Sequence, residues 1–169
     1  FVSDFILREY PNERKSHVKY MLTFSNGWGD LHAEGTGAGV VDALFNSMMG
    51  FFCKDFFSLR EVQFEDFSME VKFNSFKIRP TDAPVEIKVA LTNARQKRIY
   101  FSAQSRSLVL AGISAITGAF EYFVNAEMAF RQLQTDILEA STRNRTDLVN
   151  KYTNHAAELV KIVSYENIS

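Results

Sequence analysis

Apolar and polar residues alternate near the start of the chain and then change to a helical spacing. Val18, Tyr20, Leu22 and Phe24 alternate with the residues at 19, 21 and 23 (Lys, Met and Thr), which predicts a β-strand over residues 18–24. The Asn-Gly-Trp-Gly-Asp segment at 26–30 predicts a tight turn, and residues 31–35 should return as the partner strand. Apolar residues at 41, 44, 45, 48, 49 and 52 then follow the spacing of an amphipathic helix. These elements form a β-β-α unit, preceded by a polar lead-in with Pro11 and a charged run at 13–19.

A second, larger unit follows. Alternation over 67–73, starting near Val62, predicts a long strand that ends at 79–84, because the two prolines there cannot donate to a β-ladder. Residues 85–91 and 98–103 predict two more strands. The loop Gln104-Ser105-Arg106 leads to Ser107, a suitable N-cap for a helix that continues past the usual length, to about Phe130. The predicted order is therefore β-β-α followed by β-β-β-α, in one layered α+β fold.

The last part of the chain differs in character. A narrow apolar stripe runs from Leu148 to Val163 on a polar background, with an entry loop at 141–145 and Asp147 placed to suit the helix dipole. This predicts a C-terminal helix whose stripe packs on this domain or on a partner. We therefore expect an α+β domain over 1–140 and a helical extension over 141–169.

Composition narrows the classes of function. With 169 residues, 46% of them hydrophobic, the chain can bury a core of its own, and its net charge of −1 gives no electrostatic reason to bind nucleic acid or an anionic membrane. Without an apolar stretch approaching 18 uninterrupted residues or a signal peptide after Phe1, we expect no membrane segment. The single Cys53 excludes an internal disulfide and suits a reducing, cytoplasmic compartment.

Few residues suggest catalysis or metal binding. His17, His32 and His155 lie far apart and form no His-x-His or His-Glu-x-x-His pair, so we expect no metal and no cofactor. Cys53 is interpreted as a packed residue, and no Ser-His-Asp arrangement is specified. A small enzyme is supported only by the closeness of Asp42, His32 and Glu34 to one turn. A cluster of phenylalanines exceeds what one helical stripe can bury and suggests contact with a second subunit; its members are Phe51, Phe52, Phe56 and Phe57.

The most specific feature is the glycine run that leads into the first helix, from Glu34 to Phe45. Gly35, Gly37 and Gly39 are expected to allow positive φ and the close approach of another group. The helix start then offers free N–H groups and a positive dipole end, which favour a carboxylate or phosphate. The run lacks the Lys-Ser/Thr of a P-loop and the spacing of a dinucleotide motif. Asp42 fits either the helix dipole or a ligand contact.

Together with the order of elements, this run resembles the C-terminal regulatory domain of the 2-isopropylmalate synthase and citramalate synthase family. The family pattern is Gly-x-Gly-(Pro/Gly)-(Val/Tyr)-Asp-Ala plus a large apolar residue, and the chain reads Gly-Ala-Gly-Val-Val-Asp-Ala-Leu over 37–44. Val40 departs mildly, where the family often has proline. A strand pattern, Leu-x-x-Tyr-x-x-x-apolar, is matched by Phe64, Phe67 and Val71. The second helix, which opens at Ser107, matches more loosely, and the resemblance covers roughly residues 19–127.

The resemblance implies a domain that binds leucine or isoleucine as an end-product inhibitor, pairs as a homodimer near the effector, and regulates a catalytic (β/α)₈ synthase domain in cis or in trans. This chain is too short to hold that barrel, so we expect no enzymatic activity of its own. The implied effector site consists of Gly37, Ala38, Gly39, Val40, Val41, Asp42, Phe64, Phe67, Val71, Gln104, Arg106 and Ser107. The glycine-lined helix start would take the α-carboxylate, and Asp42 would orient the amino group. The alternative is a dimeric interaction module that kept the fold and lost the pocket.

Overall fold

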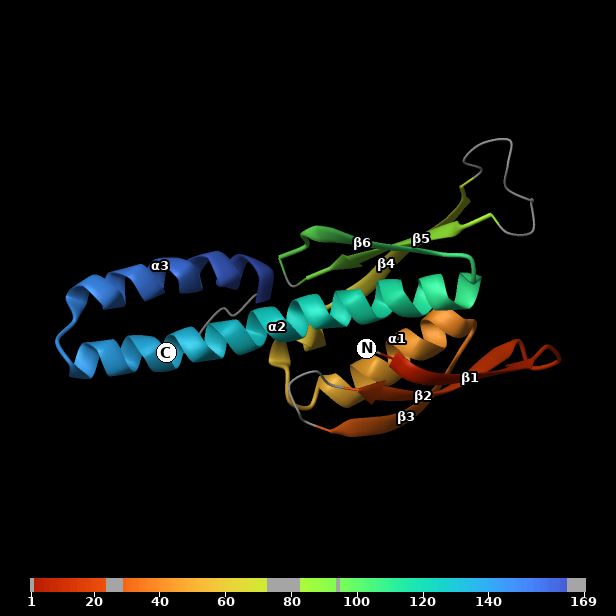
Figure 1. Cartoon of the computed structure of the whole chain (residues 1–169), viewed down its shortest axis with the longest axis horizontal. Helices are drawn as coiled ribbons and strands as arrows, with labels where there is room; N and C mark the ends of the chain where they lie inside the picture. The colour runs from red at the N-terminus through yellow and green to blue at the C-terminus, as the bar shows by residue number, and fades with distance from the viewer. Residues whose placement is uncertain (1, 24–28, 73–82, 94, 164–169) are drawn as a thin grey trace.

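Two three-stranded antiparallel sheets lie on opposite sides of a layer of helices (Figure 1). The computed structural model describes residues 2–23, 29–72, 83–93 and 95–163. Its class is α+β, as the sequence predicts. Most of the predicted turn at 26–30 and most of the proline segment at 79–84 lie outside the described residues.

The first sheet has the order β1-β2-β3 and is followed by a helix. Its strands are β1 (Val2–Tyr10), β2 (Lys15–Thr23) and β3 (Asp30–Gly37), and the helix is α1 (Val40–Phe52). The alternation predicted for the second strand is confirmed, because Val18, Tyr20 and Leu22 are all buried. Two residues separate β3 from α1, so the helix folds straight back over its own sheet.

The predicted polar lead-in is wrong, because these residues form β1 and the charged run begins β2. Phe5 and Leu7 pack against the core, whereas Ile6 between them is 49% exposed. An apolar residue on the solvent side hides the period of two, so the sequence gives no clear alternation here. The first unit is therefore β-β-β-α.

The second unit repeats this order with a longer helix. A short 3₁₀ helix, η1 (Phe57–Glu61), leads into β4 (Gln63–Val71), β5 (Val85–Thr92) and β6 (Arg98–Ser105), and then into α2 (Leu108–Thr142). Gln104 and Ser105, expected in a loop, belong to β6. Ser107 is the N-cap of α2, as predicted, and its hydroxyl accepts the N–H of Leu110 at 3.3 Å. Again two residues separate the third strand from its helix.

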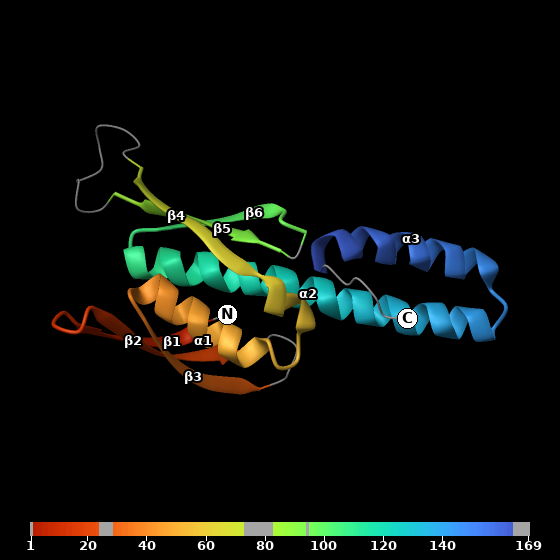
Figure 2. The same cartoon turned by 180° about the vertical axis from the view of Figure 1, so that it is seen from behind.

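Each helix contacts its own sheet and also reaches the sheet of the other unit. α1 packs on β2 and β3, and its Phe45 ring meets Phe64 of β4 with centroids 5.3 Å apart. α2 packs on β5 and β6 and also contacts β1. Figures 1 and 2 show both helices starting at the same end of the molecule, with the sheets above and below them. The buried core lies in this central layer.

The second half of α2 leaves the sheets and pairs with α3 (Thr146–Val163) in a helical hairpin (Figure 1). Ala126 and Phe130 of α2 are buried with Ala156 of α3, and Leu159 and Val160 pack against them. The described part of the C-terminal stripe therefore packs on this chain's own helix. The sequence left open whether the stripe packs on this domain or on a partner, and in the structure it packs on this domain.

By length and composition alone, α2 could cross a membrane, since it holds an 18-residue window with a mean hydropathy of 1.4. The sequence pattern did not predict this window. Many of its apolar residues, such as Ile116 and Phe123, are buried against the sheets, and a core helix meets the same test. The absence of a membrane partner stays a prediction.

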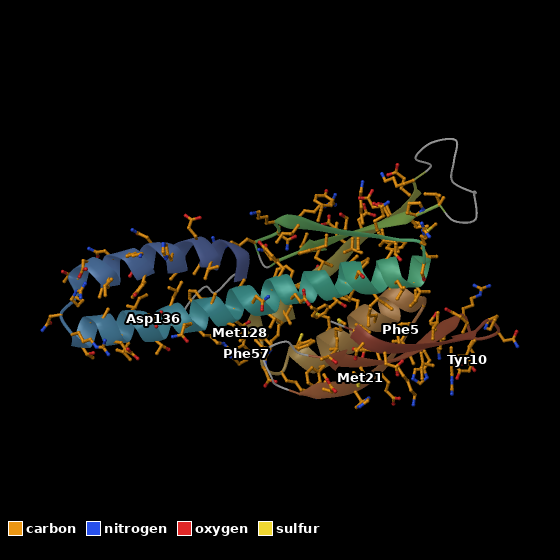
Figure 3. The ribbon with its side chains drawn as sticks, viewed as in Figure 1. Phe5, Tyr10, Met21, Phe57, Met128 and Asp136 are labelled. Atoms are coloured by element: carbon orange, nitrogen blue, oxygen red, sulfur yellow. The ribbon has the colours of Figure 1, made fainter. Side chains whose placement is uncertain are left out.

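A buried carboxylate fixes the connection between the two units to α2. Glu127 is fully buried, and it accepts hydrogen bonds from the backbone N–H groups of Phe57 (3.2 Å) and Ser58 (2.9 Å) and from the Ser58 hydroxyl (2.6 Å). Arg131, one turn later, donates to Glu127 and to the carbonyl of Asp55. Figure 3 shows Phe57 and Met128 at this junction. These bonds hold the start of η1 against α2 at the point where α2 leaves the core.

Candidate functional site

The glycine run lies in β3 and at the start of α1, and it makes no turn with positive φ. Gly35 and Gly37 are strand residues, and Gly39 is an N-cap with an extended backbone (φ −155°). Among the described glycines only Gly29 has positive φ, at 86°. The expectation of left-handed backbone at these glycines is wrong, because the chain passes from strand to helix through extended residues.

Close approach does require glycine at two of these positions, and the approaching group is α1 itself. A Cβ atom on Gly35 would lie 2.4 Å from the Cβ of Ser47, and one on Gly37 would lie 2.4 Å from the backbone nitrogen of Ala43. A Cβ on Gly39 would meet nothing within 4 Å. Two glycines therefore allow the helix to rest on the strand, and only the third faces open space.

Asp42 stabilises the start of α1. Its carboxylate accepts the backbone N–H of Ala38 at 2.8 Å and the side-chain amide of Asn46 at 3.0 Å, and the helix begins with the bond from Ala43 N–H to the Gly39 carbonyl. An acidic side chain in the first turn also suits the helix dipole. These contacts account for Asp42 without a ligand, although the residue also lines the hollow described next.

An apolar hollow of about 340 Å³ joins the two sequence motifs that the resemblance singled out. Its lining residues come from the start of α1 and from β4, and they are Gly39, Val40, Val41, Asp42, Phe64 and Phe67. β4 lies across the helix layer from β3, so only the fold brings these segments together. Six of the twelve predicted site residues meet here.

The other six lie outside the hollow. Gly37 and Ala38 precede it, and Val71 lies further along β4 with 39% of its surface exposed. Gln104 and Arg106 are exposed at the end of β6 and just beyond it, and Ser107 caps α2. The structure does not bring the loop before α2 into contact with the hollow.

Gly112 of α2 contributes to this region and was not singled out as a site residue. A Cβ on Gly112 would lie 3.1 Å from Cγ2 of Val41, so the two helices touch closely behind the hollow. The only sequence signal was a small residue in the first turns of the second predicted helix. This contact fixes the position of Val41 in the lining.

The chemistry of the hollow is that of a site for an apolar group. Among the described residues that line it, Asp42 is the only charged one. His32 and Glu34 line a separate hollow on the first sheet, and there Lys19 Nζ lies 2.9 Å from the Glu34 carboxylate and lowers its pKa by hydrogen bonding. Within the described residues, no three of His, Cys, Asp and Glu are placed to hold one metal ion. The three residues that suggested a small enzyme therefore line two different hollows, Asp42 one and His32 with Glu34 the other.

Cys53, just after α1, is expected to react slowly. Partial burial raises the pKa of its thiol, and the thiolate is the reactive form. Alkylation by iodoacetamide at pH 8 should be several-fold slower in the folded protein than in the chain unfolded in urea, as followed by mass spectrometry. Equal rates in the two states would contradict this environment.

No protein-family model matches the chain, and no curated protein matches it. The fold and the hollow thus define a class only, a duplicated β-β-β-α domain with an apolar hollow at the start of its first helix.

Proposed function

We propose that this chain is an amino-acid-binding regulatory domain that pairs as a homodimer and confers end-product feedback on a synthase of the 2-isopropylmalate or citramalate type. The effector is leucine or isoleucine, and the catalytic domain acts in cis or in trans. The chain itself carries no catalysis. The observation that supports this proposal is the apolar hollow in which the glycine-run helix start and the Phe64–Phe67 strand meet.

The chemistry of the hollow suits such a ligand. Val40, Val41 and Phe67 would enclose a branched aliphatic side chain, and the volume of about 340 Å³ lies within the roughly 300–1,000 Å³ of small-molecule sites. The first N–H groups of α1 and its positive dipole end favour a carboxylate. The Asp42 carboxylate is placed to attract an ammonium group.

Isothermal titration with leucine, isoleucine, valine and lysine tests this proposal. We expect heat and a raised melting temperature with a branched-chain amino acid, because a ligand that binds only the folded state stabilises it. Lysine, which places a charge against apolar walls, should bind much more weakly.

A pair of glycine variants assigns the heat to the hollow. Gly39→Trp directs an indole into the hollow without a clash at Cβ and should abolish binding, whereas Gly118→Trp in α2, where a Cβ also meets nothing within 4 Å, should preserve it. An absence of heat and of thermal shift with all four amino acids would remove the ligand from the proposal.

A dimeric interaction module without an effector is the second candidate. Phe64 and Phe67 are bulky where the family has leucine and tyrosine, and α3 is an added surface. This candidate predicts a dimer insensitive to amino acids and a Gly39→Trp variant that keeps its function.

A further inference from the structure

We propose that two copies of this chain pair through the free edge of β3, so that their first sheets join into one antiparallel sheet of six strands. The proposal assigns a surface to the homodimer of the proposed function and rests on that part of it. It does not depend on effector binding.

In the part of the chain that the structure describes, no strand pairs with β3 on the side away from β2, and a groove runs along this edge. Its volume is about 500 Å³, and six consecutive strand residues, Leu31 to Thr36, form one side. The other side is a flank of α1 formed by Asn46, Ser47, Gly50, Phe51 and Lys54. Six residues are the length of an ordinary strand, and the groove places a helix beside the open edge.

The edge of β3 lacks two of the features that usually prevent strand pairing, a break in register and a proline. β3 pairs with β2 in unbroken register from Asp30 to Gly37 and contains no proline. By contrast, the edge strands β1 and β4 each carry a register shift, at Val2/Asp4 and Phe64/Asp66. Bulges, prolines and charges are the usual protection of edge strands. The fourth edge strand, β6, also pairs in unbroken register and contains no proline, so β3 is favoured over β6 by the groove beside α1 and by the side-chain pairs described next.

The outward side chains of β3 are complementary to a second copy of themselves. A two-fold axis through Ala33 in an antiparallel pair sets His32 opposite Glu34 of the second copy, and Glu34 opposite His32 of the second copy. Both side chains are exposed, and an imidazole N–H donates well to a carboxylate. Glu34 already has Lys19 Nζ 2.9 Å away, and a carboxylate has further lone pairs that can accept the imidazole N–H. On the inner side, the same register sets Leu31 opposite Gly35 of the second copy, where Ser47 of α1 already lies against the glycine. The two-fold arrangement forms both His32–Glu34 pairs at once.

The helix flank fits the same axis. Ser47 lies against Gly35, and Phe51, one turn later, lines the groove together with Ala33. Phe51 is half-buried, packed on Phe52 with centroids 5.1 Å apart, and Gly50 beside it leaves open space. Two copies would bring their Phe51 rings together near the axis and cover the part of this aromatic group that remains exposed.

One backbone group on β3 already has a partner, and it remains compatible with pairing. The Ser47 hydroxyl donates to the Glu34 carbonyl at 2.8 Å and accepts from the Tyr20 hydroxyl at 2.9 Å. A carbonyl oxygen has two lone pairs, so Glu34 retains one for a strand N–H. These bonds hold β3 straight beneath α1 while its edge stays available.

Disulfide trapping tests the register. In a Cys53→Ser background, Ala33→Cys places one thiol on the proposed axis and should give a covalent dimer on mild oxidation. Thr36→Cys lies three residues from the axis, so the two thiols of a pair would be roughly 20 Å apart at 3.3 Å per residue, and it should stay uncrosslinked. A dimer in sedimentation that Ala33→Cys does not trap would overturn this surface and leave the homodimer itself intact.

A charge exchange tests the proposed pairs in solution. His32→Glu alone sets two carboxylates opposite each other across the axis, and Glu34→Lys alone replaces the acceptor opposite the imidazole with a donor. Each variant should raise the dimer dissociation constant by about tenfold or more. An equimolar mixture of the two variants restores both pairs and should dimerise like the unmodified chain, which also shows that both variants fold. Ser102→Glu, at the equivalent exposed position of β6, should have no effect.

The outcomes separate this proposal from the proposed function. A mixture that stays monomeric, or single variants that dimerise normally, would overturn the β3 surface. A chain that is monomeric at all concentrations yet binds leucine would overturn the dimer and keep the effector site, leaving the groove to an extended segment of another protein.

Discussion

Glu127→Ala is expected to lower the free energy of unfolding by about 3 kcal/mol, because removing one partner of a buried charged network leaves the others without compensation. The Glu127 carboxylate is fully buried and receives two backbone N–H groups and the Ser58 hydroxyl. Its loss would leave these donors at the start of η1 without their acceptor and would remove the carboxylate partner of Arg131, which also donates to the Asp55 carbonyl. Urea unfolding followed by circular dichroism measures the change.

Two further variants separate the charge from its surroundings. Glu127→Gln keeps the shape and one acceptor oxygen, so its cost should be smaller than that of alanine. Glu139→Ala removes an exposed carboxylate of the same helix, 3.5 Å from Arg143, and should change stability by less than about 0.5 kcal/mol, as exposed ion pairs contribute little. If Glu127→Ala cost no more than Glu139→Ala, the junction would contribute no stability.

Gly37→Ala is expected to destabilise the protein by about 2–3 kcal/mol, although it adds a single methyl group. The new Cβ would lie 2.4 Å from the backbone nitrogen of Ala43 and 2.6 Å from Oδ2 of Asp42. Backbone cannot move aside as a flexible side chain can, so α1 would have to lift from β3. The midpoint of urea unfolding should fall with the slope unchanged.

At a glycine with open space around it, substitution by alanine is expected to raise stability instead of lowering it. Gly118→Ala in α2 adds a Cβ that meets nothing within 4 Å, and it should stabilise the protein by about 0.5–1 kcal/mol through helix propensity. A stable Gly37→Ala variant would show that α1 is free to shift on β3.

Sequence periodicity predicted most of the fold. Strands with a polar outer face, such as β2, and long helices with a regular stripe were found because one face of each is buried. β1 was missed because Ile6 is apolar and exposed, so its alternation is weak. The sequence predicted two related units, a β-β-α unit and a β-β-β-α unit, but not that the first unit also has three strands.

The candidate site was predicted in part, and the reason for its glycines was not. Sequence identified both segments that line the hollow, yet no local pattern tells whether a glycine gives room to a ligand or to the chain's own helix. Gly35 and Gly37 belong to the second kind. Gln104 and Arg106 are not among the residues that line the hollow, because the position of the end of β6 relative to the hollow depends on how the two units pack.

The contacts of each helix with a strand of the other unit have a consequence for how the protein folds. Neither β1 nor β4 is covered by the helix of its own unit alone, since α2 contacts β1 and Phe45 of α1 meets Phe64. If either unit were produced alone, the apolar face of its first strand would lose the helix of the other unit that covers it. The two halves should therefore gain structure in a single cooperative transition, and separately made halves should recover it only by reassociating, as in fragment complementation.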